Sequence, residues 1–165
     1  MLKIYKFCPL CGRQLSKATF EGKKLLTCKK CLWVNYQNPL PVAVAVAYDS
    51  QNKVLAAKRG IEPGINKWAL PGGFIESGEN SESACIRELS EETGLKGSID
   101  RLLGVYIHRT KMYGPVLVIG YAVKVLKKTI SLNNELRSAA FFKKQDLPYI
   151  PFSAHRKLIE NFWNK

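Results

Sequence analysis

The chain has 165 residues, of which 46% are hydrophobic and 24% are charged, so the composition excludes a disordered protein and predicts a packed globular one. No apolar run approaches the roughly 20 residues that a membrane-spanning helix needs, and residues 1–7 hold no stretch apolar enough for a secretory signal. We therefore expect a soluble, cytoplasmic protein with no membrane contact. The formal net charge is +13, and residues 1–40 carry eight Lys or Arg against one acid, Glu21. This excess favours phosphate-rich small molecules or nucleic acid as partners, although a solvated basic surface would give the same count.

Four of the five cysteines form two close pairs near the N-terminus, Cys8 with Cys11 and Cys28 with Cys31. The C-x2-C-x16-C-x2-C spacing is typical of a zinc ribbon, in which two knuckles place four thiolates around one tetrahedral Zn²⁺ ion. Because four thiolates fill the tetrahedral coordination of Zn²⁺, no position is left for water, and we expect a structural site. A redox pair and a nucleic-acid-binding ribbon are the alternatives. We assign the ribbon to residues 1–38, with a hairpin at 17–27.

The main domain is expected to span residues 39–165 and to have an α/β fold. Its predicted strands run over residues 41–48, 54–59, 99–111, 116–126 and 136–142. The predicted helices run over 81–93, ending at Gly94, and over 154–163, with Ser153 as N-cap. Residues 68–73 lead into a loop. The strand at 41–48 alternates Val with Ala, and because Ala is too apolar for a solvent face, we expect this strand to be covered on both sides. The pattern predicts a mixed sheet with helices on both faces.

The helix at 81–93 carries the strongest chemical signal. At about 100° per residue, Glu88, Glu91 and Glu92 share one arc of the helix surface. Like charges at this spacing destabilise a bare helix, and a bound divalent cation would relieve the repulsion. Hard carboxylate ligands select Mg²⁺ or Mn²⁺. Arg87 precedes Glu91 by four residues, so we expect it to fix Glu91 and to leave Glu88 and Glu92 free for metal. An exposed acidic helix face is the alternative.

The wider spacing decides between these interpretations. Gly73, five residues, Glu79, seven residues and then the run from Arg87 to Leu95 match the pattern Gly-x5-Glu-x7-Arg-Glu-U-x-Glu-Glu-x-Gly-U, where U is aliphatic, at every defined position. This pattern is the Nudix box, and the chain resembles the Nudix hydrolase family from about residue 41 to the C-terminus. Residues 1–40 resemble the zinc ribbon that some family members carry in front.

The resemblance implies an α/β/α sandwich with a mixed sheet, preceded by the small zinc ribbon. It also implies Mg²⁺-dependent hydrolysis of a nucleoside diphosphate linked to another moiety. Carried over to this chain, the principal metal ligands would be Glu88 and Glu92, assisted by Glu91 and the carbonyl of Gly73. Glu79 would support the loop. Gly72 and Gly73 would leave room for the phosphates.

The residue that takes a proton from the attacking water lies, in much of the family, in a later loop. Here Glu135 is the candidate, because it is the only acid between Asp100 and Asp146 and a strand follows it. Glu91 is the competing base. Arg59, at the end of a predicted strand, is a candidate contact for substrate phosphates.

The substrate signal is weaker than the family signal. The NADH pyrophosphatase motif Ser-Gln-Pro-Trp-Pro-Phe-Pro is absent from this sequence. The stretch from Cys31 to Pro39 resembles short ribbon-bearing members that act on FAD or ADP-ribose, so we expect ADP-ribose or an adenine dinucleotide such as FAD. The alternative is an RNA-binding or RNA-cap-removing Nudix protein that uses the basic ribbon. Many family members are dimers, and the sequence leaves a homodimer open.

Overall fold

The computed structural model describes residues 5–127 and 129–164. The chain divides into two compact units, which we call the ribbon unit (Met1–Pro39) and the main unit (Leu40–Lys165). Each unit has its own core. None of the helices in the described part of the chain is long and apolar enough to cross a membrane.

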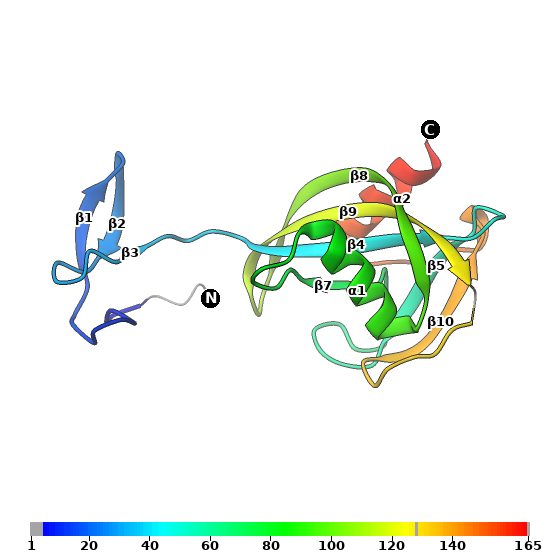
Figure 1. The fold of residues 1–165 in the computed structure, drawn as a ribbon, viewed down its shortest axis with the longest axis horizontal. Helices are drawn as coiled ribbons and strands as arrows, with labels where there is room; N and C mark the ends of the chain where they lie inside the picture. The colour runs from blue at the N-terminus through cyan, green and yellow to red at the C-terminus, as the bar shows by residue number, and fades with distance from the viewer. Residues whose placement is uncertain (1–4, 128, 165) are drawn as a thin grey trace. The chain divides into compact units, whose positions relative to one another are not determined.

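The ribbon unit contains a small antiparallel sheet of three strands in the order β1-β2-β3 (Figure 1). The strands are β1 (Ser16–Phe20), β2 (Lys23–Thr27) and β3 (Val34–Asn35). The turn between β1 and β2 consists of Glu21 and Gly22, whose φ angles are 49° and 75°. Two-residue hairpin turns favour positive φ at both positions because the resulting twist matches that of the strands. The hairpin predicted around these two residues is therefore confirmed.

The main unit is built on a seven-stranded mixed sheet with the order β10-β5-β4-β9-β8, to which β6 is added beside β5 and β7 beside β4. The strands are β4 (Leu40–Tyr48), β5 (Val54–Arg59), β6 (Trp68–Ala69), β7 (Gly72–Phe74), β8 (Lys96–Thr110), β9 (Gly114–Lys127) and β10 (Leu136–Phe142). The helices are α1 (Ser81–Thr93), the 3-10 turn η1 (Lys144–Asp146) and α2 (Ser153–Trp163). The pair β4–β9 is parallel, whereas β5, β7 and β8 run antiparallel to their neighbours.

The two faces of the sheet are buried by different helices, as the alternation in β4 predicted (Figure 1). Val44 and Val46 belong to a core cluster with Leu158 and other residues of α2. Ala43, Ala45 and Ala47 point the other way, into a cluster with Cys85, Leu89 and further residues of α1. Small alanines on the α1 side let that helix approach the sheet closely, and the α/β/α arrangement follows.

Helix α1 begins and ends where the sequence predicted. The side chain of Asn80 accepts a hydrogen bond of 2.8 Å from the backbone N–H of Ser83, which caps the first turn. Gly94 ends the helix in the left-handed conformation, at φ 68°, and its N–H donates to the carbonyl of Ser90. The carboxylates on this helix are therefore held on a well-defined scaffold.

Two local predictions were wrong. Residues 68–73 are not simply the lead into a loop, because they contain the short strands β6 and β7, which extend the sheet by pairing with β5 and β4. Ser153 is not the N-cap of α2 but its first residue, and Phe152 occupies the cap with no side-chain hydrogen bond. The Ser153 hydroxyl instead lies 3.4 Å from Nδ1 of His108.

Candidate functional site

The first part of the site is made by β7 and α1, which the chain brings together through a tight loop. Pairing of β7 with β4 sets Gly72 opposite Val44 and Gly73 opposite Ala43. A Cβ on Gly72 would collide with the backbone of β4, and its φ of 152° is one that side chains rarely adopt. The two glycines therefore allow the backbone to lie directly against the carboxylates of α1.

Glu92 is the most buried of these carboxylates, with 6% of its surface exposed. Its Oε2 accepts a hydrogen bond of 3.1 Å from the backbone N–H of Gly72. Burial raises the pKa of Glu92 to about 8, and the charges of Glu88 and Glu135 add to the rise, while the Gly72 N–H and the charge of Arg59 oppose it. Because Glu92 is buried and accepts from a single neutral donor, a nearby cation would stabilise its ionised form.

Glu88 lies against Gly73, and the place that a Cβ of Gly73 would occupy is taken by the Glu88 carboxylate. Its side chain is 16% exposed. Burial raises the pKa of Glu88, and the charges of Glu91 and Glu135 raise it further, against the effect of Arg87. Any side chain at residue 73 would push this carboxylate away from the backbone.

Arg87 ties the loop between β7 and α1 to the helix. Its Nη2 donates to Oε1 of Glu79 at 2.6 Å, and its Nε lies 3.2 Å from Oε2 of the same carboxylate. This two-point contact lowers the pKa of Glu79, with the backbone N–H of Glu76 as a second cause. The same Nη2 also donates to the carbonyl of Phe74 at 3.1 Å. Arg87 thus holds the loop from both ends.

Arg87 also reaches the carboxylates of its own helix. Its Nη1 lies 2.9 Å from Oε1 of Glu88 and 3.0 Å from Oε2 of Glu91. The pairing with Glu91 was expected from the sequence, but the prediction that Arg87 leaves Glu88 free was wrong. One guanidinium carries five donors in a fixed fork, so it can serve three carboxylates at once.

The segment before β10 brings Glu135 to the same site. Backbone hydrogen bonds fasten this segment to the end of α1, from Ser131 N–H to the carbonyl of Thr93 at 2.8 Å and from Asn133 N–H to the carbonyl of Glu92 at 3.2 Å. Asn133 also accepts from the backbone N–H of Glu135 through its side chain. The Glu135 carboxylate is exposed and close enough to raise the pKa of both Glu88 and Glu92.

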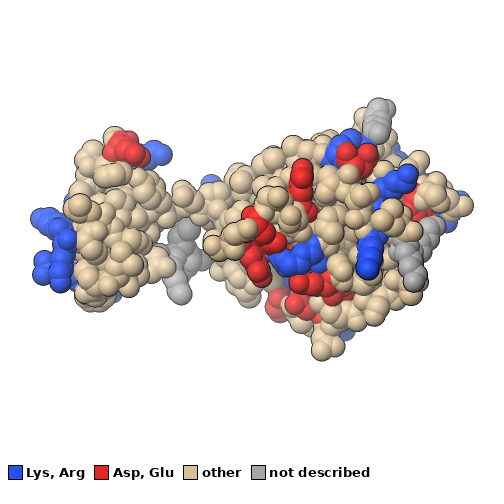
Figure 2. All heavy atoms as spheres, viewed as in Figure 1, with Lys and Arg blue, Asp and Glu red and all other residues tan. Residues whose placement is uncertain are grey.

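Arg59 completes the site from the end of β5. Its neighbour Gly60 donates a backbone hydrogen bond of 2.6 Å to the carbonyl of Glu135, so the end of β5 and the Glu135 segment are joined. The Arg59 Nε donates to the carbonyl of Pro63 at 2.8 Å, and its positive charge lowers the pKa of Glu92. The site therefore combines an acidic floor with a basic residue at its rim. Figure 2 shows acidic side chains gathered around a basic one on the face that carries α1.

Sequence reasoning missed some of the supporting contacts. His155, on α2, accepts a hydrogen bond of 3.1 Å at Nδ1 from the backbone N–H of Leu70, and burial lowers its pKa to about 3. It therefore stays neutral and anchors the chain just before Gly72. Asn133 was also missed, although an Asn-Asn pair before a strand is a recognisable turn signal. No pattern in the sequence links His155 to a residue 85 positions away.

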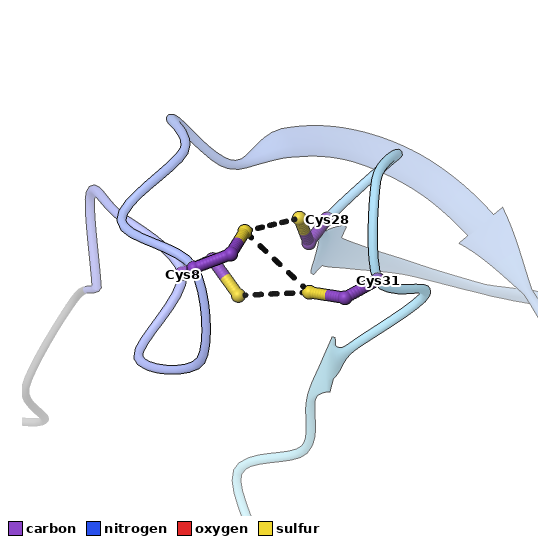
Figure 3. Close-up of side chains that lie close together, drawn as sticks. Cys8, Cys28 and Cys31 are labelled. Carbon is purple, nitrogen blue, oxygen red and sulfur yellow. Dashed lines mark hydrogen bonds between the residues drawn. The ribbon is translucent and has the colours of Figure 1, made fainter.

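A separate candidate metal site lies in the ribbon unit, where the four predicted cysteines come together (Figure 3). Their sulfur atoms all lie within 4.8 Å of one another. The sulfur–sulfur distances are 3.3 Å for Cys8–Cys31 and 3.6 Å for both Cys11–Cys28 and Cys11–Cys31. Four sulfurs at about 2.3 Å from a tetrahedral zinc would be about 3.8 Å apart, so the cluster fits a small zinc site.

The electrostatics of the cysteines favour a cation as well. The backbone N–H of Cys31 is the main cause that lowers the pKa of Cys28 to about 6, which favours the thiolate that metals bind. Hydrogen bonding to the sulfurs of Cys8 and Cys28 raises the pKa of Cys31 to about 12, because neighbouring sulfurs disfavour a further negative charge. Four thiolates this close therefore need a metal ion to coexist. Cys85, a residue of α1, is buried in the core of the main unit.

Comparison with known proteins assigns the main unit. The family model described as the NUDIX domain matches residues 38–162. The chain belongs to the Nudix family. The activity class predicted from the sequence, a Nudix hydrolase, is thus confirmed.

Individual relatives extend this assignment. An ADP-ribose pyrophosphatase from Methanocaldococcus jannaschii is 37% identical over 154 residues, which cover 93% of this chain and 87% of the relative. The human diphosphoinositol polyphosphate phosphohydrolase 3-alpha is 34% identical over 87 residues, about half of each chain (49% and 50%). The crystal structure of a Nudix hydrolase from Nitrosomonas europaea superposes with a TM-score of 0.83 at 29% identity, covering 98% of this chain and 92% of that one. The protein is a Nudix pyrophosphohydrolase homologous to an ADP-ribose pyrophosphatase.

Proposed function

We propose that this Nudix hydrolase cleaves the diphosphate of ADP-ribose, or of a related adenine dinucleotide such as FAD. The observation that carries the proposal is the cluster of Glu92, Glu88 and Glu135 against the bare backbone of Gly72 and Gly73. The 37% identity to an ADP-ribose pyrophosphatase over 93% of the chain supports the choice of substrate. Cytoplasmic location and a homodimer stay predictions.

The donor set at α1 fits Mg²⁺ or Mn²⁺. Glu88, Glu91 and Glu92 offer hard carboxylate oxygens. The pKa of Glu92 is raised because burial disfavours its ionised form, and a cation would stabilise that form. These three residues, with the carbonyl of Gly73, would hold the cation. When bound, it would neutralise diphosphate charge and make a nearby water more acidic. One zinc ion would be held by the four thiolates of Cys8, Cys11, Cys28 and Cys31.

The residues then divide the work. Arg59 meets a phosphate oxygen and aligns the diphosphate. Glu135 accepts a proton from the attacking water, whose oxygen bonds to one phosphorus while the bridging P–O bond breaks and its electron pair leaves with the other phosphate. For ADP-ribose the products are AMP and ribose 5-phosphate. Glu135 is favoured over Glu91 as the base because Arg87 holds Glu91 at 3.0 Å, whereas Glu135 has no ion pair with any described residue.

The test is hydrolysis of a substrate panel by wild type and Glu92→Gln in Mg²⁺: ADP-ribose, FAD, NADH, diadenosine polyphosphates and NAD-capped RNA. A preference for ADP-ribose or FAD that disappears in the variant supports the proposal. Hydrolysis of diadenosine polyphosphates alone would overturn the proposed substrate. Glu135→Gln should lower kcat, whereas Glu91→Gln should chiefly raise the Mg²⁺ concentration needed for half-maximal rate.

The basic ribbon unit supports the second candidate, removal of caps from RNA. Its residues hold a strong excess of Lys and Arg, and Phe20 and Tyr36 form an exposed edge-to-face pair with centroids 6.2 Å apart. Exposed aromatic and basic side chains suit single-stranded nucleic acid. In the panel, a kcat/KM for capped RNA well above that for ADP-ribose, falling steeply with salt, would favour this candidate.

A further inference from the structure

A pocket lies on the main unit, at the opposite end of β5 from the carboxylate site. It has a volume of about 510 Å³ and is lined by residues 51–53, residues 143–145 and Trp163. Strand β5 joins the two places. Its first residue, Val54, pairs with Phe142 beside this pocket, and its last, Arg59, pairs with Leu136 beside Glu135. Six residues of strand separate the two sites by roughly 20 Å.

The walls of this pocket are fixed by hydrogen bonds. Asp49 is buried, and its Oδ1 accepts from the backbone N–H groups of Gln51 at 2.8 Å and Lys53 at 3.0 Å, which sets the turn between β4 and β5. The indole Nε1 of Trp163 donates to the carbonyl of Asn52 at 3.3 Å. The tryptophan is therefore held against the turn, and the pocket exists before any ligand binds.

The lining has one sign of charge. Lys53, Lys143 and Lys144 contribute three ammonium groups, and none of the lining residues is acidic. Within the part of the chain that the structure describes, none of these lysines forms an ion pair with a carboxylate, and the Lys144 ammonium donates only to the side chain of Asn164, at 3.3 Å. Unpaired ammonium groups around one hollow attract an anion with several oxygens, above all a phosphate.

The rest of the lining suits a nucleoside. Trp163 offers an aromatic surface for a base, and the side-chain amides of Gln51, Asn52 and Gln145 offer both donors and acceptors. The volume falls within the range of about 300–1,000 Å³ that is usual for small-molecule sites. We propose that this pocket binds a nucleoside phosphate, with its phosphate on the lysines and its base against Trp163. The site is separate from the hydrolytic one and does not depend on which substrate that site cleaves.

The test adds AMP to the full, zinc-loaded chain in the absence of Mg²⁺. Binding is followed by the indole N–H signals in ¹⁵N spectra. Trp163 reports on the pocket, and Trp68, which pairs with Lys58 near the other end of β5, reports on the region of the carboxylate site. The Lys143→Gln/Lys144→Gln variant is compared with Lys96→Gln/Lys124→Gln, which removes two exposed lysines elsewhere and keeps the net charge equal.

We expect AMP to shift the Trp163 signal with a Kd below about 1 mM. The pocket variant should weaken this binding at least about tenfold, and the control variant should not change it. A shift of Trp68 alone, an equal loss in both variants, or no shift of Trp163 at 10 mM AMP would overturn the site. Inorganic phosphate that shifts Trp163 as strongly as AMP, or adenosine that does so, would overturn the nucleoside phosphate as ligand.

Discussion

The ribbon unit and the main unit each gather side chains that carry like charge when deprotonated, cysteines in the first and glutamates in the second, but the two clusters differ in their relation to folding. Among the described residues of the ribbon unit, the core cluster holds three buried residues, and two of them, Cys8 and Cys28, belong to the sulfur cluster. The main unit buries fourteen residues in one cluster and ten in the other, one on each face of its sheet. The core of the ribbon unit is too small to offset the conformational entropy that its chain loses on folding, whereas the core of the main unit is large enough. We infer that metal at the sulfurs is needed for folding and metal at the carboxylates only for function.

The largest expected effect comes from breaking the sulfur cluster. Cys28→Ser should release zinc and unfold the ribbon unit, because metal binding supplies about 10 kcal/mol or more of the folding free energy of such a unit. The main unit should keep its fold. Zinc release with a colorimetric chelator and amide dispersion in ¹⁵N spectra measure the two consequences.

Cys85→Ala is the matched control, since Cys85 is a buried residue of α1 and does not belong to the sulfur cluster. It should retain zinc and a dispersed ribbon unit. If Cys28→Ser lost its zinc yet kept the dispersed signals of β1 and β2, the ribbon unit would fold without metal, and the contrast between the units would fail.

The second effect is on catalysis alone. Glu92→Gln should lower kcat/KM at least about 100-fold, because changes even to residues that only support metal ligands cost about 10- to 100-fold. Stability at pH 8 should not fall, since a neutral amide suits the buried position and can still accept from the Gly72 N–H. Steady-state kinetics and thermal unfolding give the two results.

Glu82→Gln, on the exposed first turn of the same helix, should leave both quantities unchanged. A Glu92→Gln enzyme within about threefold of wild-type kcat/KM would remove Glu92 from the metal site. An unfolded variant would contradict the inference that this carboxylate serves function at the expense of stability.

The third effect tests the loop that Arg87 holds. Arg87→Lys keeps the charge but loses the fork that contacts Glu79 at two points and Phe74, Glu88 and Glu91 at one each. We expect kcat/KM to fall about 10- to 100-fold and the Mg²⁺ concentration for half-maximal rate to rise. Arg101→Lys, at a surface ion pair with Asp100, should change neither. A Mg²⁺ titration that is unchanged in Arg87→Lys would show that the loop does not position the ligands.

The fold and much of the site followed from local patterns in the sequence. Period-two alternation predicted β4 and its two covered faces, and Gly94 marked the end of α1. The grouping of Glu88, Glu91 and Glu92 followed from helical spacing, and that of the cysteines from two short knuckles. These features depend on residues close in sequence, where backbone geometry alone determines which side chains meet.

What the sequence did not reveal depends on long-range packing. The contact of His155 with Leu70 joins α2 to the chain before Gly72, and no local pattern encodes it. The strands β6 and β7 have two and three residues, too few for a periodic signal, and they form because β4 and β5 offer open edges. The extra contact of Arg87 with Glu88 reflects the folded position of the loop rather than helical spacing.

The smallest expected effect concerns how pH acts on the metal-free main unit. The pKa of Glu92 is raised from its ordinary value of 4.5 to about 8, so the folded state holds this proton after the unfolded state has lost it. Stability should therefore be greatest below pH 4.5, as far as Glu92 is concerned, and should fall as pH rises from 4.5 to 8. We expect a loss of stability across this window, seen as a lower Tm at pH 8 than at pH 5.

Mg²⁺ should restore this stability at pH 8, because the cation replaces the proton as the partner of the buried carboxylate. Thermal unfolding of zinc-loaded protein at pH 5 and pH 8, with and without Mg²⁺, measures the effect. Glu92→Gln is the control, because it has no proton to lose and should show a smaller fall and a smaller response to Mg²⁺. Equal pH dependence in the two proteins would place the titrating group elsewhere. The expected result is a larger fall in stability in the wild type than in Glu92→Gln, which Mg²⁺ abolishes in the wild type alone. It would show that the main unit folds without its cation and that cation binding offsets the cost of the Glu92 charge.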